Sequence, residues 1–363
     1  MLDKIGRAID RASYSVLWHI FRKTGPDGEV VFYAHYPLSY KMFEPIHSLI
    51  PNTRIVVSPQ NGGVSSVLSD MKVQHSTRRG YPKIVICADF PDGFYPKTTG
   101  IKFLHIMHGV ADKNYAYDKE LNSHVDFHIV PGPHIREMLI SKAGVEPERI
   151  RVVGFPKLDS LFNGTLDRSA ILEELGLDPN RKTILYAPTT RDEFNSLLLV
   201  AQHLNRIARK YNVLVKLHPG YDPRYSDQGL PWIKLFQGTS NVHLTPFQDA
   251  VPYMYASDLL IADAGSIMFE FSALQRPIVL VDVPTKYRGM GGFDGDGIEQ
   301  RWRDIGVRVR DPLDLPKAIE QAFATHNLFR DRQKEYAQRL FYKLDGNSSV
   351  RAAEAISSIS LGL

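Results

Sequence analysis

The sequence contains a single cysteine and lacks any long uninterrupted apolar run. With Cys87 alone among 363 residues, no disulfide can form within the chain, and a cysteine metal cluster is excluded. No apolar run approaches the roughly 18 residues that a membrane-spanning helix needs. The start of the chain also lacks the pattern of a cleavable secretion signal. We therefore expect a protein of the reducing cytoplasm, in which contact with the inner face of the cell membrane would be peripheral.

A strong charge imbalance is also missing. The 44 Lys and Arg residues against 40 Asp and Glu give a net charge of +4, which is too small to indicate nucleic-acid binding. A weak positive charge suits anionic substrates or an anionic membrane surface. Hydrophobic content of 43% and charged content of 23% are typical of a soluble globular protein. The length suits two domains of roughly 150–200 residues each.

What the sequence does contain is a regular alternation of short apolar runs and helical segments. Such alternation is typical of α/β domains built on mostly parallel sheets. A polar, turn-rich stretch over 156–180 indicates the boundary between two halves. The expected strands are Val30–Ala34, Arg54–Val57, Ile84–Ala88, Lys102–Met107, Phe127–Val130 and Arg151–Val153 in the first half, and Thr183–Ala187, Val213–Leu217, Val242–Leu244, Leu259–Ala262, Ile278–Val281 and Val307–Val309 in the second.

The clearest single unit is LLIADAGSIMFEFSALQRPIVLVD at 259–282, which predicts a strand, a turn, a helix and a second strand. Gly265 and Ser266 at the helix start would let backbone amides approach an anion, which the helix dipole also favours. Glu270 follows one turn later on the same helix face and is suited to accept hydrogen bonds from ribose hydroxyls. An ordinary capped βαβ unit without a ligand explains this pattern equally well.

Polar residues follow four of the expected strands, at the edge where parallel sheets bind ligands. His108-Gly109 follows one strand of the first half, and His218 follows one of the second. Thr189 and Arg191 follow a third strand, and the Ser266 turn follows a fourth. Imidazole, guanidinium and hydroxyl groups together suit a phosphate or pyrophosphate. Each histidine taken alone is compatible with a structural turn, and Arg191 with a solvent-exposed ion pair.

Two other kinds of site are poorly supported. His105, His124, His128 and His134 lie near His108 in the sequence, but no metal-ligand spacing with carboxylates is present, so we expect no metal. The Gly-x-Ser-x-Gly pattern of serine hydrolases is absent.

The first helical segment is amphipathic and basic, a pattern typical of helices that lie in a lipid headgroup layer. The alternative is that this helix packs on its own domain. The apolar stripe is Ile5, Ile9, Ala12, Val16 and Ile20, the basic residues are Lys4, Arg7, Arg11 and Arg22, and the expected interfacial aromatics are Trp18 and Phe21.

The combined motifs resemble the CDP-glycerol glycerophosphotransferases of teichoic-acid and capsule synthesis. The segments that carry the resemblance are HIMHGVADK at 105–113, VVGFPKLDSLF at 152–162, ILYAPTTRDEF at 184–194, VLVKLHP at 213–219 and LLIADAGSIMFEFSALQRPIVLV at 259–281. The resemblance implies a GT-B fold, in which two Rossmann-like domains face a central cleft. It implies an N-terminal acceptor domain over 26–165 and a nucleotide-binding domain over 166–340, flanked by the amphipathic helix (1–25) and a C-terminal helix (341–363).

The resemblance also implies the chemistry. An alditol phosphate, most simply glycerol phosphate, passes from a CDP-alditol donor to a hydroxyl of a lipid-linked or polymer acceptor, CMP leaves, and no cofactor is needed. The family histidines match His108 and His218, which we expect to be catalytic. The nucleotide and phosphate ligands we expect are Thr189, Arg191, Gly265, Ser266 and Glu270, and on the acceptor side Gly109 and Asp112.

The chain departs from the family pattern at two places. The His-Gly motif continues as Val110-Ala111-Asp112 where the family usually has Thr-Pro, and Asp263-Ala264-Gly265-Ser266 stands where the family has Asp-Tyr-Ser-Ser. Two alternatives remain: a glycosyltransferase or UDP-sugar epimerase of the same fold, with Asp89, Asp92 or Asp112 as acid/base, and a non-catalytic nucleotide-binding scaffold. The sequence leaves open the donor alditol, the acceptor, the number of transfers and the oligomeric state.

Overall fold

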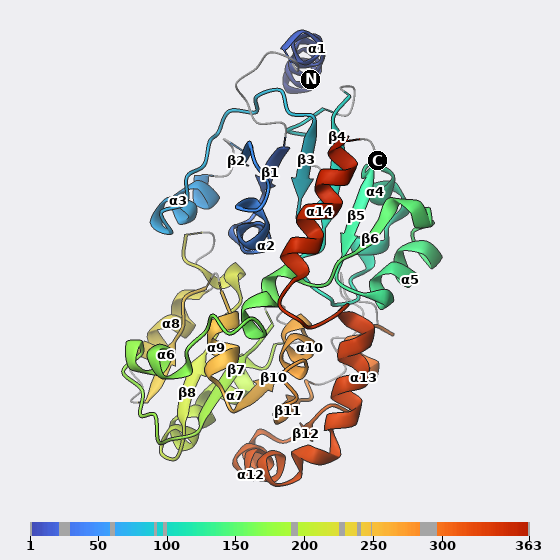
Figure 1. Ribbon diagram of the computed structural model, residues 1–363. Helices are drawn as coiled ribbons and strands as arrows, with labels where there is room; N and C mark the ends of the chain where they lie inside the picture. The colour runs from blue at the N-terminus through green and yellow to red at the C-terminus, as the bar shows by residue number, and fades with distance from the viewer. Residues whose placement is uncertain are drawn as a thin grey trace. The chain divides into compact units, whose positions relative to one another are not determined.

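A computed structural model describes the chain as two compact units (Figure 1). Unit 1 comprises residues 1–108, 116–157 and 347–363, and unit 2 comprises 109–115 and 158–346. The residues that the structure describes are 2–21, 30–58, 62–90, 93–96, 100–189, 195–224, 229–237, 241–247, 249–283 and 296–361.

Unit 1 is built on a parallel six-stranded sheet in the order β2-β1-β3-β4-β5-β6. Its strands are rich in Val, Ile and Phe and mostly buried, as expected for a parallel sheet covered by helices on both faces. The strands are β1 (Val30–Ala34), β2 (Thr53–Val57), β3 (Ile84–Cys87), β4 (Lys102–Ile106), β5 (Phe127–Val130) and β6 (Ile150–Val152), and the helices are α1 (Leu2–Phe21), α2 (Pro37–His47), α3 (Gly62–Asp70), α4 (Lys119–Ser123), α5 (Pro133–Ser141) and α14 (Ser348–Leu361).

Unit 2 repeats this architecture with the strand order β12-β11-β10-β7-β8-β9, again all parallel. The strands are β7 (Thr183–Ala187), β8 (Asn212–Val215), β9 (Val242–Leu244), β10 (Leu259–Ala262), β11 (Ile278–Val281) and β12 (Val307–Val309). The helices are α6 (Arg168–Glu174), α7 (Leu197–Ala208), α8 (Leu230–Gln237), α9 (Val251–Ala256), α10 (Ser266–Ser272), α11 (Ile298–Arg301), α12 (Leu315–Thr325) and α13 (Arg330–Leu340).

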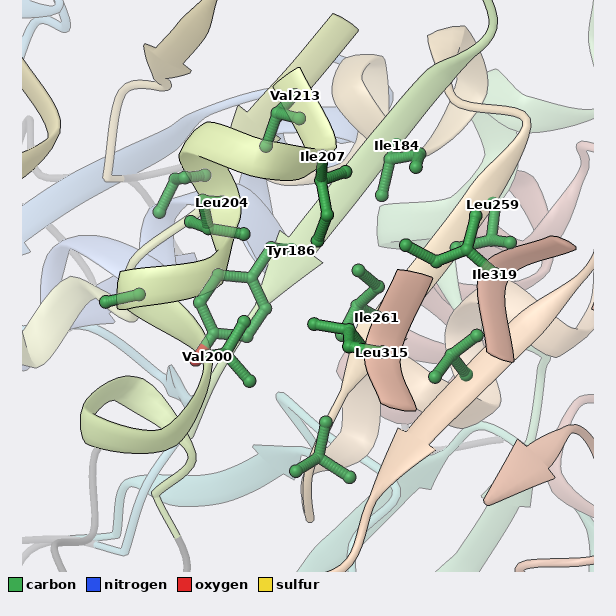
Figure 2. Packing of buried hydrophobic residues seen from close by; sticks show 14 of the residues in the cluster. Ile184, Tyr186, Val200, Leu204, Ile207, Val213, Leu259, Ile261, Leu315 and Ile319 are labelled. Atoms are coloured by element: carbon green, nitrogen blue, oxygen red, sulfur yellow. The ribbon is translucent and has the colours of Figure 1, made fainter. Parts of the chain in front are cut away.

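The core of unit 2 lies between one face of its sheet and the helices α7 and α12. Figure 2 shows Tyr186 of β7 packed among Val200 and Leu204 of α7, while Leu315 of α12 lies beside Ile261 and Ile319 beside Leu259 of β10. These side chains are almost fully buried, and each contributes about 1.5–3 kcal/mol through removal of its apolar surface from water. This packing fixes the strands whose carboxyl ends carry the candidate site.

The expected strands are all present, and they differ from the observed ones only at their ends. The α/β class with parallel sheets is thereby confirmed. The end differences arise where polar residues follow an apolar run. The run expected to extend to Leu217, for example, ends as a strand at Val215, although Lys216 still donates its amide hydrogen to Tyr186 O at 2.8 Å.

Helix α1 packs on unit 1 through one face. Trp18 is 2% exposed and its Nε1 donates a hydrogen bond to Pro82 O at 2.7 Å, while the Tyr14 hydroxyl donates to Gly80 O at 2.7 Å. A Cβ at Gly100 would approach the Trp18 ring to 2.6 Å, so glycine makes room for the indole. The expectation that Trp18 is an interfacial aromatic is therefore wrong. Val16 and Ile20 of the predicted stripe are nevertheless 61% and 58% exposed.

Candidate active site

Four neighbouring strands of unit 2 end at polar residues. β8 leads into His218, β7 into Thr189, β10 into Asp263 and β11 into Asp282. Because neighbouring parallel strands present their carboxyl ends at one edge of the sheet, this row of residues occupies the position where open α/β sheets bind ligands.

Asp263 organises the centre of this edge. One carboxylate oxygen, Oδ1, accepts the amide hydrogens of Thr189 (2.9 Å) and Ala264 (2.7 Å), and Oδ2 accepts both the amide (2.8 Å) and the hydroxyl (2.9 Å) of Ser196. Burial raises the pKa of this carboxyl, and the hydrogen bonds from Ser196, Thr189 and Ala264 oppose that rise. The carboxylate thus holds both ends of the segment between Thr189 and Ser196. Arg191 belongs to that segment and lies outside the described residues.

Lys216 and His218 occupy the end of β8. Lys216 is 5% exposed, and its Nζ donates to Leu217 O (2.8 Å) and Phe247 O (2.7 Å), so its ammonium group ties the end of β8 to the segment after β9. His218 is exposed, and its Nδ1 accepts the amide hydrogen of Gly220 at 3.1 Å. A neutral imidazole whose Nδ1 accepts must carry its hydrogen on Nε2.

The segment after His108 belongs to unit 2, although the strand before it belongs to unit 1. The Ser266 hydroxyl oxygen accepts the amide hydrogens of Val110 and Ala111, both at 3.2 Å. A Cβ at Gly109 would lie 2.8 Å from the Ser266 Oγ, so only glycine fits this approach without displacement. The structure thereby brings together Gly109 and Ser266, two residues that the sequence analysis assigned to opposite partners in the reaction.

Asp112 continues this segment into a buried carboxylate pair. It is 1% exposed, and its Oδ2 accepts the amide hydrogen of Ile298 at 3.2 Å. The next residue, Glu299, is also 1% exposed. Burial raises the pKa of Glu299 to about 8; the nearby Asp112 charge adds to the rise, and the backbone amides of Glu299 and Asp112 oppose it. Glu299 therefore holds a proton at neutral pH.

Glu270 also lies inside unit 2. It is 2% exposed on α10, a helix that packs against α13. The helix begins at Ser266 with Gly265 as its N-cap residue.

In unit 1, His108 follows β4 and lies beside the residues that follow β3. His108 Nδ1 is 2.7 Å from Ala88 O and 3.7 Å from Asp89 Oδ1. A carbonyl oxygen can only accept, so Nδ1 carries the hydrogen and the neutral ring has its lone pair on Nε2. His108 is therefore set as a base at Nε2, whereas His218 is set as a donor at Nε2.

Two further histidines lie buried beneath His108. The rings of His105 and His128 come from adjacent strands, with centroids 5.7 Å apart. Burial lowers the pKa of His105 to about 4 and that of His128 to about 3, so both are neutral at physiological pH. Within the described residues, no three histidine, cysteine or acidic side chains are grouped as metal ligands.

Comparison with solved structures supports the fold class that this geometry defines. The wall teichoic acid polymerase TagF matches with a TM-score of 0.72 at 19% identity, covering 100% of this chain and 98% of the solved chain. The UDP-GlcNAc 2-epimerase of Neisseria meningitidis matches with a TM-score of 0.58 at 16% identity, over 91% and 99% of the two chains. These likenesses confirm the expected GT-B-type α/β fold.

The sequence itself identifies the family. The family described as CDP-Glycerol:Poly(glycerophosphate) glycerophosphotransferase matches residues 70–358, and the chain belongs to this family. The teichoic acid glycerol-phosphate transferase of Staphylococcus aureus is 23% identical over 304 residues, which cover 73% of this chain and 73% of that protein. The teichoic acid poly(glycerol phosphate) polymerase of Staphylococcus epidermidis is 27% identical over 251 residues, 64% of this chain. The matched part is 33% of that polymerase's length.

Sequence reasoning did not assign roles to several residues of the site. Asp263 directly follows strand β10 in the unit at 259–282. Its place after four apolar residues is the sequence feature that could have identified it as a buried carboxylate. Asp89 was considered only for a sugar-transfer alternative. The role of Glu299 could not be predicted from its neighbours in the sequence, because Asp112, which lies near it in the fold, is nearly 190 residues earlier in the chain.

Proposed function

We propose that this protein transfers an alditol phosphate, with glycerol phosphate as the first candidate, from a CDP-alditol donor to a hydroxyl acceptor and releases CMP. Membership of the glycerophosphotransferase family supports the reaction class. The observation that carries the proposal is that the two strand-end histidines use Nδ1 in opposite ways: His108 Nδ1 faces the carbonyl oxygen of Ala88, whereas His218 Nδ1 accepts the amide hydrogen of Gly220. One neutral imidazole offers a base and the other a hydrogen-bond donor, a combination that suits displacement at a phosphorus atom.

The proposed reaction proceeds by in-line displacement. The acceptor hydroxyl gives its proton to Nε2 of His108, and its oxygen attacks the distal phosphorus of the donor. The bond between that phosphorus and the bridging oxygen breaks, and the electron pair leaves with CMP. Nε2–H of His218 donates a hydrogen bond to the pyrophosphate and stabilises the charge that develops on the leaving group. Positioning and electrostatics suffice, without a covalent enzyme intermediate.

The donor ligands we propose are Thr189, Arg191, Gly265, Ser266 and Glu270. Thr189 is fixed by Asp263, and Ser266 is fixed by the amides after Gly109. Glu270 would act on the ribose, although only 2% of its surface is exposed. Gly109 and Asp112 would act on the acceptor side by shaping the backbone that follows His108.

The related proteins favour glycerol phosphate without excluding ribitol phosphate. Two glycerol-phosphate primases and a ribitol-phosphate primase of Bacillus are among the relatives. A TagF structure soaked with CDPG has the same fold as this chain. We propose a lipid-linked or polymeric acceptor of the cell envelope, as in wall or capsule polymers.

We also propose that the protein works on the inner face of the cell membrane as a peripheral protein. None of the described helices is long and apolar enough to cross a bilayer. The exposed stripe of Val16 and Ile20 on α1, together with Leu17 and Phe21 at 40% and 42% exposure, supports contact with a membrane surface. The side chains of Lys4, Arg7, Arg11 and Arg22, which would supply the charge, lie outside the described residues.

The decisive experiment incubates the purified protein with CDP-glycerol, CDP-ribitol or UDP-N-acetylglucosamine and a lipid-linked saccharide acceptor. Chromatography then measures CMP and UDP. We expect acceptor-dependent release of CMP from CDP-glycerol. Release of UDP, or conversion of the UDP-sugar without release, would instead establish the glycosyltransferase or epimerase alternative. Nucleotide binding without turnover of any donor would establish the scaffold alternative.

A further inference from the structure

Asp89 lies next to His108 at the carboxyl edge of the unit 1 sheet. β3 and β4 are parallel neighbours with Cys87 opposite His105, so the residues that follow the two strands meet at one edge. Asp89 Oδ1 is 3.7 Å from His108 Nδ1, and both side chains are 22% exposed.

The distances separate two roles around one ring nitrogen. Ala88 O, at 2.7 Å, receives the hydrogen of Nδ1 and fixes the tautomer. Asp89, at 3.7 Å, is beyond hydrogen-bond distance and acts through its charge. A negative charge this close to a largely desolvated imidazole favours the imidazolium form.

Two buried histidines near His108, His105 and His128, do not provide this charge. His105 interacts electrostatically with both Asp89 and His108, but burial lowers its pKa to about 4. Phe90 stacks on His105 at 4.9 Å between ring centroids, and the His128 ring packs edge-on against His105 at 5.7 Å, so these neighbours are uncharged at neutral pH.

We propose that Asp89 is the positioning residue of His108: its carboxylate stabilises the imidazolium that forms when His108 takes the proton of the acceptor hydroxyl. This inference rests on the proposed transferase function and adds a residue to it. Ala88 O sets which nitrogen is the base, and Asp89 sets how readily that nitrogen holds the proton. Asp89 does not touch the reacting atoms.

The test compares Asp89→Asn with the wild type in the full chain. Asparagine keeps the shape and removes the charge. We expect His108 to titrate about one pH unit lower in D89N, as measured by NMR of ring-labelled histidine with H108N as the assignment control. We expect kcat for CMP release to fall about tenfold or more, its acidic limb to move to lower pH, and KM for CDP-glycerol to stay unchanged. Asp89→Glu should restore part of the turnover, and Asp70→Asn, an exposed change at the end of α3, should leave all three quantities at wild-type values.

The outcomes distinguish this inference from the proposed function. A protein that releases CMP in a His108-dependent manner, with a D89N pH profile superimposable on the wild type, overturns the role of Asp89 and leaves the function intact. A D89N effect confined to KM also overturns it. A shifted His108 titration in a protein that turns over no CDP-alditol supports the pairing and overturns the transferase.

Discussion

Asp263 holds Ser196 twice through a single carboxylate oxygen, at 2.8 Å from the amide nitrogen and 2.9 Å from the hydroxyl oxygen. We predict that Asp263→Asn destabilises the fold by about 1–3 kcal/mol, because the amide places donor hydrogens against a donor amide in a buried site. Urea unfolding measures the free energy. Asp311→Asn is the matched control, since that exposed side chain accepts one amide hydrogen and keeps this capacity as asparagine. Equal stability of the two variants would contradict the bracing role of Asp263.

Replacing His108 or His218 by asparagine removes the ring nitrogen Nε2 and keeps a polar group near the position of Nδ1. At position 108 the amide can still donate to Ala88 O, and at position 218 the carbonyl can still accept from Gly220. We predict that His108→Asn and His218→Asn each lower turnover by about a hundredfold or more, with melting temperatures close to the wild type. His124→Asn, at the end of α4, serves as the control. A folded variant with near-normal turnover would make that histidine structural only.

From the raised pKa of Glu299 we predict that the folded protein loses stability as the pH rises. Its folded pKa of about 8 lies above the ordinary value of 4.5, so between these pH values the folded state holds a proton that the unfolded state has lost. Stability is then full below about pH 4.5 and falls as the pH rises through 8, at up to about 1.4 kcal/mol per pH unit. Glu299→Gln should flatten this dependence between pH 6 and 8 in urea unfolding, whereas the exposed Glu173→Gln should keep it. Parallel curves for all three proteins would show that Glu299 is ionised in the fold.

From the lowered pKa of His128 we predict the opposite pH dependence, a loss of stability as the pH falls. The folded pKa of His128 is about 3 against an ordinary 6.5, and neither ring nitrogen has a hydrogen-bond partner within the described residues. Below pH 6.5 the His128 side chain binds a proton in the unfolded state but stays neutral in the folded state. The stability that is present above pH 6.5 is therefore lost as the pH falls toward 3. We predict that His128→Leu loses less stability than the wild type between pH 7 and 5. The matched control is the partly exposed His124→Leu, which should follow the wild-type curve.

From the exposed apolar face of α1 we predict that the protein binds anionic membranes. We expect the wild type to sediment with phosphatidylglycerol vesicles and only weakly with phosphatidylcholine vesicles. Binding should weaken steeply with salt, since each basic residue near the surface contributes about 1 kcal/mol. Replacing Val16 and Ile20 by serine should reduce binding without unfolding the protein, because Tyr14 and Trp18 hold the helix in place. Leu198→Ser, at 79% exposure, is the control, and equal binding of both variants would contradict the proposed surface.

The sheets were predictable because each parallel strand is an apolar run bounded by polar residues, a signal that lies within a few consecutive positions. Tertiary packing was not. The apolar stripe of α1 suggested which face is buried, yet the buried residues Tyr14 and Trp18 lie outside that stripe. Both pack in the core of unit 1 and donate to the carbonyl oxygens of Gly80 and Pro82. The grouping of 109–115 with unit 2 depends on contacts with Ser266 and Ile298, far away in the sequence. The histidines could be found by their place after strands, but the tautomers inferred for their rings depend on partners that only the fold brings to them.

Helix α14 has a consequence for how the protein is made. It packs on α2 of unit 1, with Arg351 donating to Val153 O at 2.7 Å, although 158–346 intervene in the sequence (Figure 1). During synthesis, α14 can therefore pack on α2 only after the whole of unit 2 has been translated. The apolar surface of α2 stays open to chaperones and to neighbouring nascent chains for that interval. A stop codon after residue 346 would yield a translation product with a finished second unit and a first unit prone to aggregate.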